Sequence, residues 1–306
     1  MSFGQRLKRA VARSPWMGGW VRRCLRRLLR WVPFPVTAEA RIMAWMVRCT
    51  QGGTVEFCNS DGIRFRLDLR EYVQARVYCY DYYEIDCVRA TKNLMTAGAT
   101  VVDVGANIGQ YSLLAASLVG KAGRVVAFEP DPDIACHLRE HIAMNGFRIE
   151  VQQYALGDKD GRQGFYPAGW AGNQGQGSLL PAESDRSGIR KSQSVDVEVK
   201  RLDDVMQAMA IGYIDFLKID VEGYELRVLQ GGEKLLQAGN IAAMMVELSP
   251  QNLGQSGDSV ESLVGYLAGY GYDPFVADRK GRLLPMSLPV RADVNAFFIL
   301  GGLAVE

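Results

Sequence analysis

The chain has 306 residues and a formal net charge of +1, and 48% of its residues are hydrophobic and 23% charged. These fractions are ordinary for a globular protein and argue against wholesale disorder, while the length suits one large α/β domain with additions or two small domains. The charge is uneven, because residues 1–30 hold nine of the 35 lysines and arginines and none of the 34 acidic residues. The rest lacks the basic excess of an enzyme that acts on nucleic acid, so we expect no nucleic-acid partner.

The six cysteines form no Cys-x-x-Cys pair and show no metal-like spacing with the two histidines. This pattern predicts reduced, mostly buried cysteines in a cytoplasmic protein, because disulfides are rare in that compartment. No apolar run approaches the ~20 residues needed to span a bilayer. Arginines interrupt every apolar stretch near the N-terminus, which argues against a secretory signal.

Residues 1–35 are expected to form a basic amphipathic arm. Apolar side chains recur there at helical spacing, at Trp20, Val21, Cys24, Leu25, Leu28 and Leu29. Arginines fill the opposite face, at positions 22, 23, 26, 27 and 30. The pattern predicts that residues 1–31 lie on an anionic membrane surface, which would place the protein peripherally on the inner face of a membrane. A helix packed on the domain with a solvated basic face and an organelle transit peptide are the two alternatives.

Residues 36–98 are expected to form an N-terminal cap with a hairpin and a helical region. Apolar and polar residues alternate over Val55–Leu69 around Asp61-Gly62, which predicts the hairpin. A tyrosine-rich stretch follows between Tyr72 and Tyr83. Clustered tyrosines are typical of core or lid packing, and their place just before the first core strand makes a lid one hypothesis for this stretch.

From Thr100 onward strands alternate with helices, which predicts a mostly parallel sheet with helices on both faces. The expected strands are 100–104, 124–129, about 149–155, 213–219, 241–248, 272–277 and 294–300, and the expected helices are 108–119, 131–144, 224–238 and 259–268. Residues 161–194 lack periodicity and are expected to be a functional or disordered loop, before Val195–Val199 resumes as a strand. The sequence thus predicts a Rossmann-like, seven-stranded α/β sheet with an antiparallel last strand over residues 99–306.

A buried strand runs into a glycine turn and a helix near residue 105, and the next strand ends in Glu129, whose carboxylate can accept hydrogen bonds from both hydroxyls of a ribose. The dinucleotide-binding fingerprint has glycines at positions one, three and six. When its first glycine is placed at Gly105, the other two positions are Asn107 and Gln110, whose side chains would lie where a pyrophosphate needs bare backbone. The turn better suits S-adenosylmethionine, which lacks phosphates, with Asp103 near its cationic methionine end. The alternative is that the glycines only tighten a strand–helix turn.

A second group of polar residues lies around the carboxyl ends of two later strands. Lys218, Asp220 and Glu222 surround the end of the fourth predicted strand, and Glu247 lies near the end of the fifth. Ligands of an open α/β sheet bind outside these ends. Converging carboxylates there could hold a base that takes a hydroxyl proton or could ligate a divalent cation. Ion pairing between Lys218 and its neighbours is the structural alternative.

Several runs of the chain carry a more specific resemblance. They are Val102–Gly109, Val126–Pro130, Ala155–Asp158, Leu202–Asp204 and Lys218–Glu225. In their order and spacing, over roughly residues 80–250, the chain resembles the FkbM-family methyltransferases of the class I S-adenosylmethionine-dependent superfamily. The Lys-Ile-Asp-Val-Glu-Gly run is the one that points to this family, whereas the glycine turn is shared by many methyltransferases.

The resemblance implies methyl transfer from S-adenosylmethionine to a hydroxyl of a sugar, a glycolipid or another lipid-linked or small-molecule acceptor. It also implies that Asp103 and Gly105 line the methionine end of the cofactor, that Glu129 binds the ribose and that Asp158 lies near the adenine. The expected cofactor site is completed by Asn107, Gly109, Pro130, Ala155 and Leu156. The basic arm lies outside the resemblance.

An acceptor alcohol must lose its proton as its bond to the methyl group forms. His137 and His141 fall on the helix after the second strand, so the base is expected to be a carboxylate, with Asp220 first and Glu222 or Glu247 behind it. Asp220→Asn is then expected to abolish turnover and to leave cofactor affinity within a few fold. No metal site is assigned, although a metal-assisted version with Asp220 and Glu247 as ligands stays open.

Two alternatives from other functional classes remain. One is a nicotinamide-dependent oxidoreductase, which Asn107 and Gln110 in the turn disfavour. The other is a catalytically silent, membrane-tethered binding module that keeps the fold without the chemistry. Cofactor titration distinguishes the first from a methyltransferase, and turnover with a true acceptor distinguishes the second.

Overall fold

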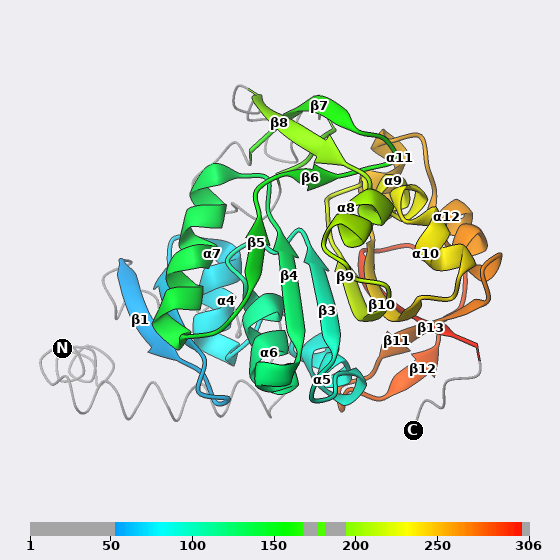
Figure 1. Ribbon diagram of the computed structural model, residues 1–306. Coiled ribbons are helices and arrows are strands. Elements are labelled where there is room, and N and C mark those ends of the chain that lie inside the picture. The colour runs from blue at the N-terminus through cyan, green and yellow to red at the C-terminus, as the bar shows by residue number, and fades with distance from the viewer. Residues whose placement is uncertain (1–52, 168–176, 181–193, 302–306) are drawn as a thin grey trace, which may run out of the picture. The chain divides into compact units, whose positions relative to one another are not determined.

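The computed structural model of the chain describes residues 53–167, 177–180 and 194–301 (Figure 1). The chain divides into two compact units, Met1–Ile85 with Ala171–Asn173 and Asp86–Trp170 with Gln174–Glu306. The arm predicted for residues 1–35 lies outside the described residues and stays a prediction. Among the helices that the structure describes, none combines the length and the apolar character that crossing a membrane requires.

The described part of the first unit begins with the predicted hairpin. Strands β1 (Thr54–Cys58) and β2 (Arg64–Asp68) pair antiparallel. Their connection is fixed by Asn59, whose side-chain oxygen accepts hydrogen bonds from the main-chain N–H groups of Asp61 and Ile63 at 3.0 and 2.9 Å. Asparagine favours such turns because its short side chain reaches the following backbone. The hairpin prediction is therefore confirmed.

The tyrosine-rich stretch forms helix α4 (Tyr72–Tyr80) and the turn after it. Tyr78 and Tyr82 are buried, as core packing predicts. The hydroxyl of Tyr82 donates a 2.6 Å hydrogen bond to the Asp61 carboxylate, which ties the helical part of this unit to the hairpin turn. The lid hypothesis for this stretch stays a prediction.

The second unit is built on a mixed sheet (Figure 1). In sheet order its strands are β12 (Leu283–Pro285), β11 (Tyr272–Ala277), β13 (Val294–Leu300), β10 (Ile241–Leu248), β9 (Ile214–Ile219), β3 (Thr100–Val104), β4 (Arg124–Phe128) and β5 (Glu150–Gln152). Strands β10, β9, β3, β4 and β5 run parallel, and β13 is antiparallel to both of its neighbours. The mixed α/β sheet and the antiparallel last strand are as predicted.

The predicted count of seven strands differs from the eight in this sheet, because β12 adds a strand at the edge. The chain reverses at Asp278, whose main-chain N–H donates to the carbonyl of Arg282 at 2.9 Å. The Asp278 carboxylate accepts from the N–H groups of Lys280 and Arg282 at 2.8 and 3.0 Å. The returning segment then pairs antiparallel with β11. A three-residue strand that ends in proline is too short to show the alternation from which strands are predicted.

The third predicted strand, 149–155, is split between two sheets. Its main-sheet part ends at Gln152, and Ala155–Leu156 forms β6 of a separate three-stranded sheet with β8 (Val195–Lys200) and β7 (Gly161–Phe165). The prediction of irregular structure is therefore wrong over residues 161–165. Strand β7 buries one apolar side chain, Phe165, so its sequence has little periodicity and its order comes from pairing with β8.

Helices cover both faces of the main sheet, as predicted (Figure 1). In chain order they are α5 (Ile85–Leu94), α6 (Gln110–Val119), α7 (Pro132–Asn145), α8 (Leu202–Ala208), α9 (Glu225–Gly231), α10 (Glu233–Gln237), α11 (Pro250–Gln255) and α12 (Val260–Ala268), with a 3-10 turn at Gly120–Ala122. Val102 of β3 packs in one core with Leu229 of α9 and Leu263 of α12. Ala127 of β4 packs with Leu138 of α7 on the opposite face.

The helix predicted over 224–238 is interrupted after Gly231. A Cβ on Gly231 would lie 2.1 Å from the carbonyl oxygen of Gly157, so the backbone of the second sheet approaches the helix closely at this point. The expectation for the cysteines also needs correction. Of the four described cysteines, Cys58 and Cys136 are exposed, Cys87 is half-buried and Cys79 is buried.

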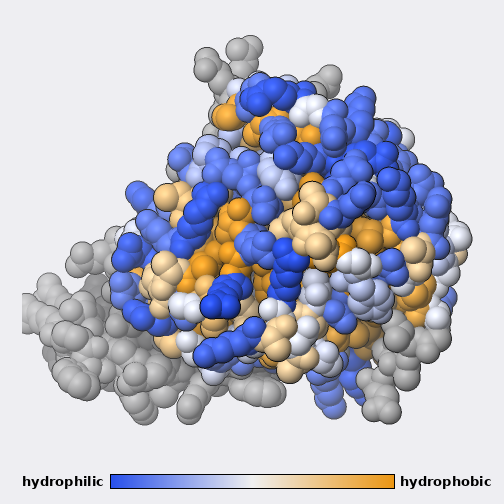
Figure 2. Space-filling model, viewed as in Figure 1, coloured by the Kyte–Doolittle hydropathy of each residue, from blue (hydrophilic) through white to orange (hydrophobic). Residues whose placement is uncertain are grey.

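The surface near the end of the sheet is partly apolar. Figure 2 shows apolar surface among hydrophilic side chains in the region of α7 and the edge strand β5. These elements carry Ile142 and Val151, which are half-buried and pack against the cluster of Ala127 and Leu138. The apolar surface thus lies at an outer margin of the core.

Candidate active site

Most of the predicted site residues gather at one edge of the main sheet. Strands β10, β9, β3 and β4 are parallel neighbours, so their carboxyl ends meet at the same edge. Ligands of open α/β sheets bind outside this edge. The residues form two groups there, the glycine turn with Glu129 and a charged group around Lys218.

Glu129 follows β4 and is buried. Its two carboxylate oxygens accept hydrogen bonds from the main-chain N–H groups of Asn107 and Asp131, each at 2.9 Å. Burial raises the pKa of Glu129 to about 7, although both hydrogen bonds act in the opposite direction. Pro130, half-buried, follows directly and separates Glu129 from the cap of α7. Glu129 therefore links the turn after β3 to the end of β4.

The glycine turn has a backbone that side chains would disturb. Gly105 has φ +77°, and a Cβ there would lie 1.8 Å from the carbonyl oxygen of Asp220. Gly109 has φ +92°, and its Cβ would lie 2.4 Å from Leu138. Asn107 is also left-handed, with φ +51°, a conformation that asparagine tolerates better than most residues. The turn is thus compact and touches the segment after β9.

Asp103 and Lys218 form the buried centre of the charged group. They are direct partners across β3 and β9. The Asp103 carboxylate accepts a short hydrogen bond from the Ser112 hydroxyl and lies 3.6 Å from the Lys218 ammonium. Lys218 is 4% exposed, and its ammonium donates to the carbonyl of Gly105 at 2.7 Å and lies 3.2 Å from the Asp220 carboxylate. The ion pairing left open as an alternative for Lys218 is therefore present.

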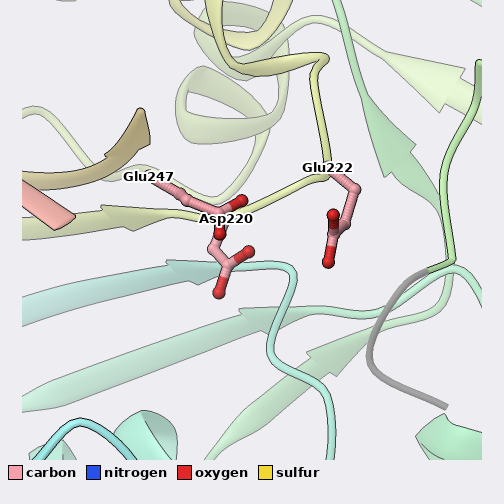
Figure 3. A group of neighbouring side chains, drawn as sticks. All are labelled: Asp220, Glu222 and Glu247. Atoms are coloured by element: carbon pink, nitrogen blue, oxygen red, sulfur yellow. The ribbon is translucent and has the colours of Figure 1, made fainter. Parts of the chain in front are cut away.

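Three carboxylates converge beside this centre. Asp220 and Glu222 lie on the segment after β9, and Glu247 lies near the end of β10 (Figure 3). One carboxylate oxygen of each lies within 4.8 Å of the others. Like charges so close together repel one another, which favours protonation of one carboxyl or the binding of a cation. The structure thus brings together the acids predicted as base candidates.

Glu222 has an unusual backbone conformation, and hydrogen bonds from two distant segments hold it in place. Its φ is +55°, which is unusual for a residue with a side chain. The side-chain amide of Asn252 donates to its carboxylate at 2.7 Å, and the hydroxyl of Ser178 donates to its carbonyl at 2.9 Å. Burial and the nearby charges of Asp220 and Glu225 raise the pKa of Glu222 well above its ordinary value.

Sequence reasoning missed the residues that shape this segment. Glu225 is 1% exposed, and its carboxylate accepts from the N–H groups of Val221 and Gly223 at 3.1 and 3.0 Å. Burial raises its pKa to about 7. A glutamate at the start of a predicted helix is a signal that could have found it. Ser178 and Asn252 come from distant parts of the chain, and nothing in the local sequence indicates them.

Three residues of the predicted cofactor site, of which Asp158 is the one expected near the adenine, lie on or just after strand β6 of the second sheet. Ala155 and Leu156 are buried in hydrophobic clusters, Leu156 in the main core. Asp158 follows β6, is half-buried and lies close enough to Tyr224 that its charge contributes to a raised pKa of that hydroxyl, for which burial is the larger cause. Any cofactor contact from this segment would therefore come from main-chain groups or from Asp158, and the adenine contact stays a prediction.

The two histidines lie on α7, the helix after the second strand, as predicted. His141 is buried, and its Nδ1 lies 2.8 Å from the carbonyl oxygen of Ile108, where it supports the end of the glycine turn.

Residues 103–274 match the family model of the methyltransferase FkbM domain. Over 208 residues the chain is 31% identical to the 31-O-demethyl-FK506 methyltransferase FkbM of Streptomyces tacrolimicus. The matched region covers 61% of this chain and 75% of that protein. Over 143 residues it is 30% identical to the 2-O-methyltransferase NoeI of Sinorhizobium fredii, covering 44% of this chain and 58% of that protein.

A further relative is the AMB antimetabolite synthetase AmbE of Pseudomonas aeruginosa, 28% identical over 81% of this chain and 13% of that protein. The chain thus spans a small part of AmbE and somewhat more than half of NoeI. The five parallel strands of the mixed sheet, the glycine turn and the acid after the next strand are typical of Rossmann-like proteins, whose ligands bind outside the strand ends. The chain belongs to the FkbM methyltransferase family.

Proposed function

We propose that this protein transfers a methyl group from S-adenosylmethionine to a hydroxyl oxygen. The observation that carries the proposal is the geometry of Glu129 and the glycine turn, in a chain that belongs to a methyltransferase family. S-adenosylmethionine supplies an electrophilic methyl group on a cationic sulfur. The role of the chain is then to align that group with the acceptor oxygen and to remove the hydroxyl proton.

The donor and acceptor groups of the turn fit this cofactor. Glu129 offers a carboxylate to a ribose, since each of its oxygens has a lone pair beyond the one that a main-chain N–H occupies. Asp103 lies near the end of β3 with a carboxylate that is paired with Lys218, and the Gly105 carbonyl, which accepts from the same ammonium, keeps a second lone pair for a donor at the methionine end of the cofactor. Asn107 occupies a position where a pyrophosphate would need bare backbone. Asp103, Gly105, Asn107, Gly109 and Glu129 would therefore hold the cofactor.

The acceptor is proposed to be a hydroxyl of a sugar, a glycolipid or a related metabolite rather than a nucleic acid. The names of three relatives support this class, since one is a 2-O-methyltransferase, one a hexuronic acid methyltransferase and one a 31-O-demethyl-FK506 methyltransferase. The basic arm at residues 1–31 supports an acceptor at an anionic membrane surface on the cytoplasmic side, where a lipid-linked sugar would lie.

The test is to treat a glycan and lipid extract of the producing cells with the protein and S-adenosylmethionine labelled in its methyl group. We expect label to appear in an alkali-stable ether within a glycan or glycolipid, together with release of S-adenosylhomocysteine. Label confined to nucleic acid, or turnover of NAD in place of S-adenosylmethionine, would contradict the proposal. A protein that binds the cofactor but transfers nothing would support a silent binding module instead.

A further inference from the structure

We propose that Glu222, rather than Asp220, takes the proton of the acceptor hydroxyl, and that Asn252 and Ser178 are the residues that position it. This inference rests on the proposed methyl transfer and names the base within the carboxylate group of Figure 3. It reverses the order expected from the sequence, in which Asp220 came first.

Asp220 and Glu222 differ in the partners of their carboxylates. The Asp220 carboxylate lies 3.2 Å from the Lys218 ammonium and is therefore engaged in an ion pair. The partner of Glu222 is the neutral amide of Asn252, at 2.7 Å. Two carboxylates whose surroundings push their proton affinities apart generally have different roles. Burial raises the pKa of Glu222, and in the described residues no cation is paired with its carboxylate, so Glu222 is suited to take up a proton.

Hydrogen bonds hold Glu222 and its flanking backbone in place from three directions. Ser178 donates to its main-chain carbonyl at 2.9 Å, and Asn252 fixes its carboxylate. Glu225 accepts from the N–H groups on either side, at Val221 and Gly223. These bonds stabilise a left-handed residue that would otherwise be strained, and such strain is concentrated at functional sites. Among the described residues, the side chain of Asp220 is held by the ion pair with Lys218 alone.

The surroundings of the Glu222 carboxylate are rich in negative charge. Negative charges face Glu222 from Asp220 and Glu225 on its own segment, from Asp293 before β13, and from Glu247 of β10. Burial and the charges of Asp220, Glu225 and Asp293 raise the pKa of Glu222, whereas the Asn252 hydrogen bond lowers it. A base with a raised pKa takes a hydroxyl proton more readily, provided that the solution is alkaline enough to ionise it.

The reaction step is balanced as follows. A bond forms between the acceptor oxygen and the methyl carbon while the bond between that carbon and sulfur breaks, and the sulfur keeps the electron pair and becomes neutral. The hydroxyl proton moves to the Glu222 carboxylate, which is neutralised and then returns the proton to solvent. No oxidant, reductant or further reactant is needed.

The test compares Glu222→Gln, Asp220→Asn and Glu247→Gln, with exposed Glu261→Gln as the matched control. Methyl transfer is measured on the extract fraction that the wild-type protein methylates, and S-adenosylhomocysteine affinity is measured by calorimetry. We expect Glu222→Gln to lower turnover by about 10²–10⁴-fold with affinity little changed. Asp220→Asn should cost less, and Glu261→Gln should match the wild type. If Asp220→Asn loses turnover while Glu222→Gln keeps nearly normal turnover, the assignment of the base is wrong. If the wild-type protein does not bind S-adenosylhomocysteine at all, the proposed function is wrong instead.

The pH dependence of turnover distinguishes a base from a residue with only a structural role, because only loss or gain of a proton on the base shifts the pH profile. Turnover should rise with pH as Glu222 ionises. Asp220→Asn removes a charge that raises the pKa of Glu222 and should move this rise to lower pH, whereas Asn252→Leu removes a bond that lowers the pKa and should move it to higher pH.

A carboxyl titration followed by NMR on protein labelled at the glutamate side-chain carboxyls reports the same shifts without any acceptor, with Glu222→Gln identifying the resonance. Ser178→Ala should lower turnover, and Ser178→Thr, which keeps the hydroxyl, should restore most of it. The proposal is wrong if the Glu222 carboxyl titrates like an exposed glutamate. It is also wrong if its pKa rises in Asp220→Asn or falls in Asn252→Leu.

Discussion

The ammonium of Lys218 donates a 2.7 Å hydrogen bond to the carbonyl oxygen of Gly105, which joins the end of β9 to the glycine turn after β3. The same ammonium lies between the carboxylates of Asp103 and Asp220. One buried cation therefore organises the turn expected to hold the cofactor and the segment expected to act on the acceptor.

Replacing Lys218 by methionine should destabilise the fold strongly. The change keeps most of the side-chain volume but leaves Asp103, 1% exposed, without its cation, and breaking a buried pair from one side costs about 3–5 kcal/mol. Urea unfolding measures the difference. The control is Arg162→Met, which removes an exposed ion pair with Asp196 and should cost less than about 1 kcal/mol. If both variants lose the same free energy of unfolding, the buried ion pairs of Lys218 contribute no more to stability than an exposed pair does.

Gly105→Ala should be much more harmful than alanine at another left-handed glycine. At Gly105 the added Cβ would lie 1.8 Å from the Asp220 carbonyl oxygen, so the turn must separate from the segment after β9. The control is Gly146→Ala, where φ is +65° and nothing lies within 4 Å, so that the cost is limited to backbone strain of about 1–2 kcal/mol. Thermal unfolding and S-adenosylmethionine affinity should both fall further for Gly105→Ala. Similar behaviour of the two variants would contradict the close approach.

Glu225 should make the protein less stable as the pH rises. Its pKa is raised to about 7 when folded, mainly by burial, so the folded state holds this proton more tightly than the unfolded state does. Stability from this group is therefore complete below its unfolded pKa and is lost as the pH rises through about 7. Glu225→Gln keeps an acceptor oxygen but cannot ionise, so its stability relative to the wild type should increase between about pH 5 and about pH 8. Urea unfolding across this range checks the trend, and Glu261→Gln should show none. A trend of opposite sign would contradict the cause given for the shift.

The basic arm should bind anionic membranes. Flotation with vesicles of phosphatidylglycerol and phosphatidylcholine should carry the full chain but not a variant that begins at Val36, and added salt should weaken the binding. Vesicles of phosphatidylcholine alone are the control. Equal flotation of both proteins would show that the arm packs on the domain or serves another purpose.

The fold was predictable where periodicity was strong. Buried parallel strands such as Val101–Val104 and capped helices such as α7 show the pattern of their environment directly. Strand β7 and the edge strand β12 were missed because their order comes from partners rather than from their own apolar pattern.

The site was predictable to the extent that its residues end neighbouring strands. Asp103, Glu129 and Glu247 meet at one edge because parallel strands bring their carboxyl ends together. Ser178 and Asn252 were not predictable, since they reach Glu222 from segments 44 and 30 residues away along the chain. Their contribution depends on tertiary contact, which local sequence does not encode.

The most direct test of the central claim is calorimetric titration of the wild-type protein and of Glu129→Ala with S-adenosylmethionine, S-adenosylhomocysteine and NAD. The account predicts that the wild type binds both sulfur ligands and not NAD, and that Glu129→Ala binds them at least about tenfold more weakly, because a ribose hydroxyl loses a charged partner. The control Glu261→Gln should bind as the wild type does. Tight binding of NAD, or unchanged affinity of Glu129→Ala for S-adenosylhomocysteine, would contradict it.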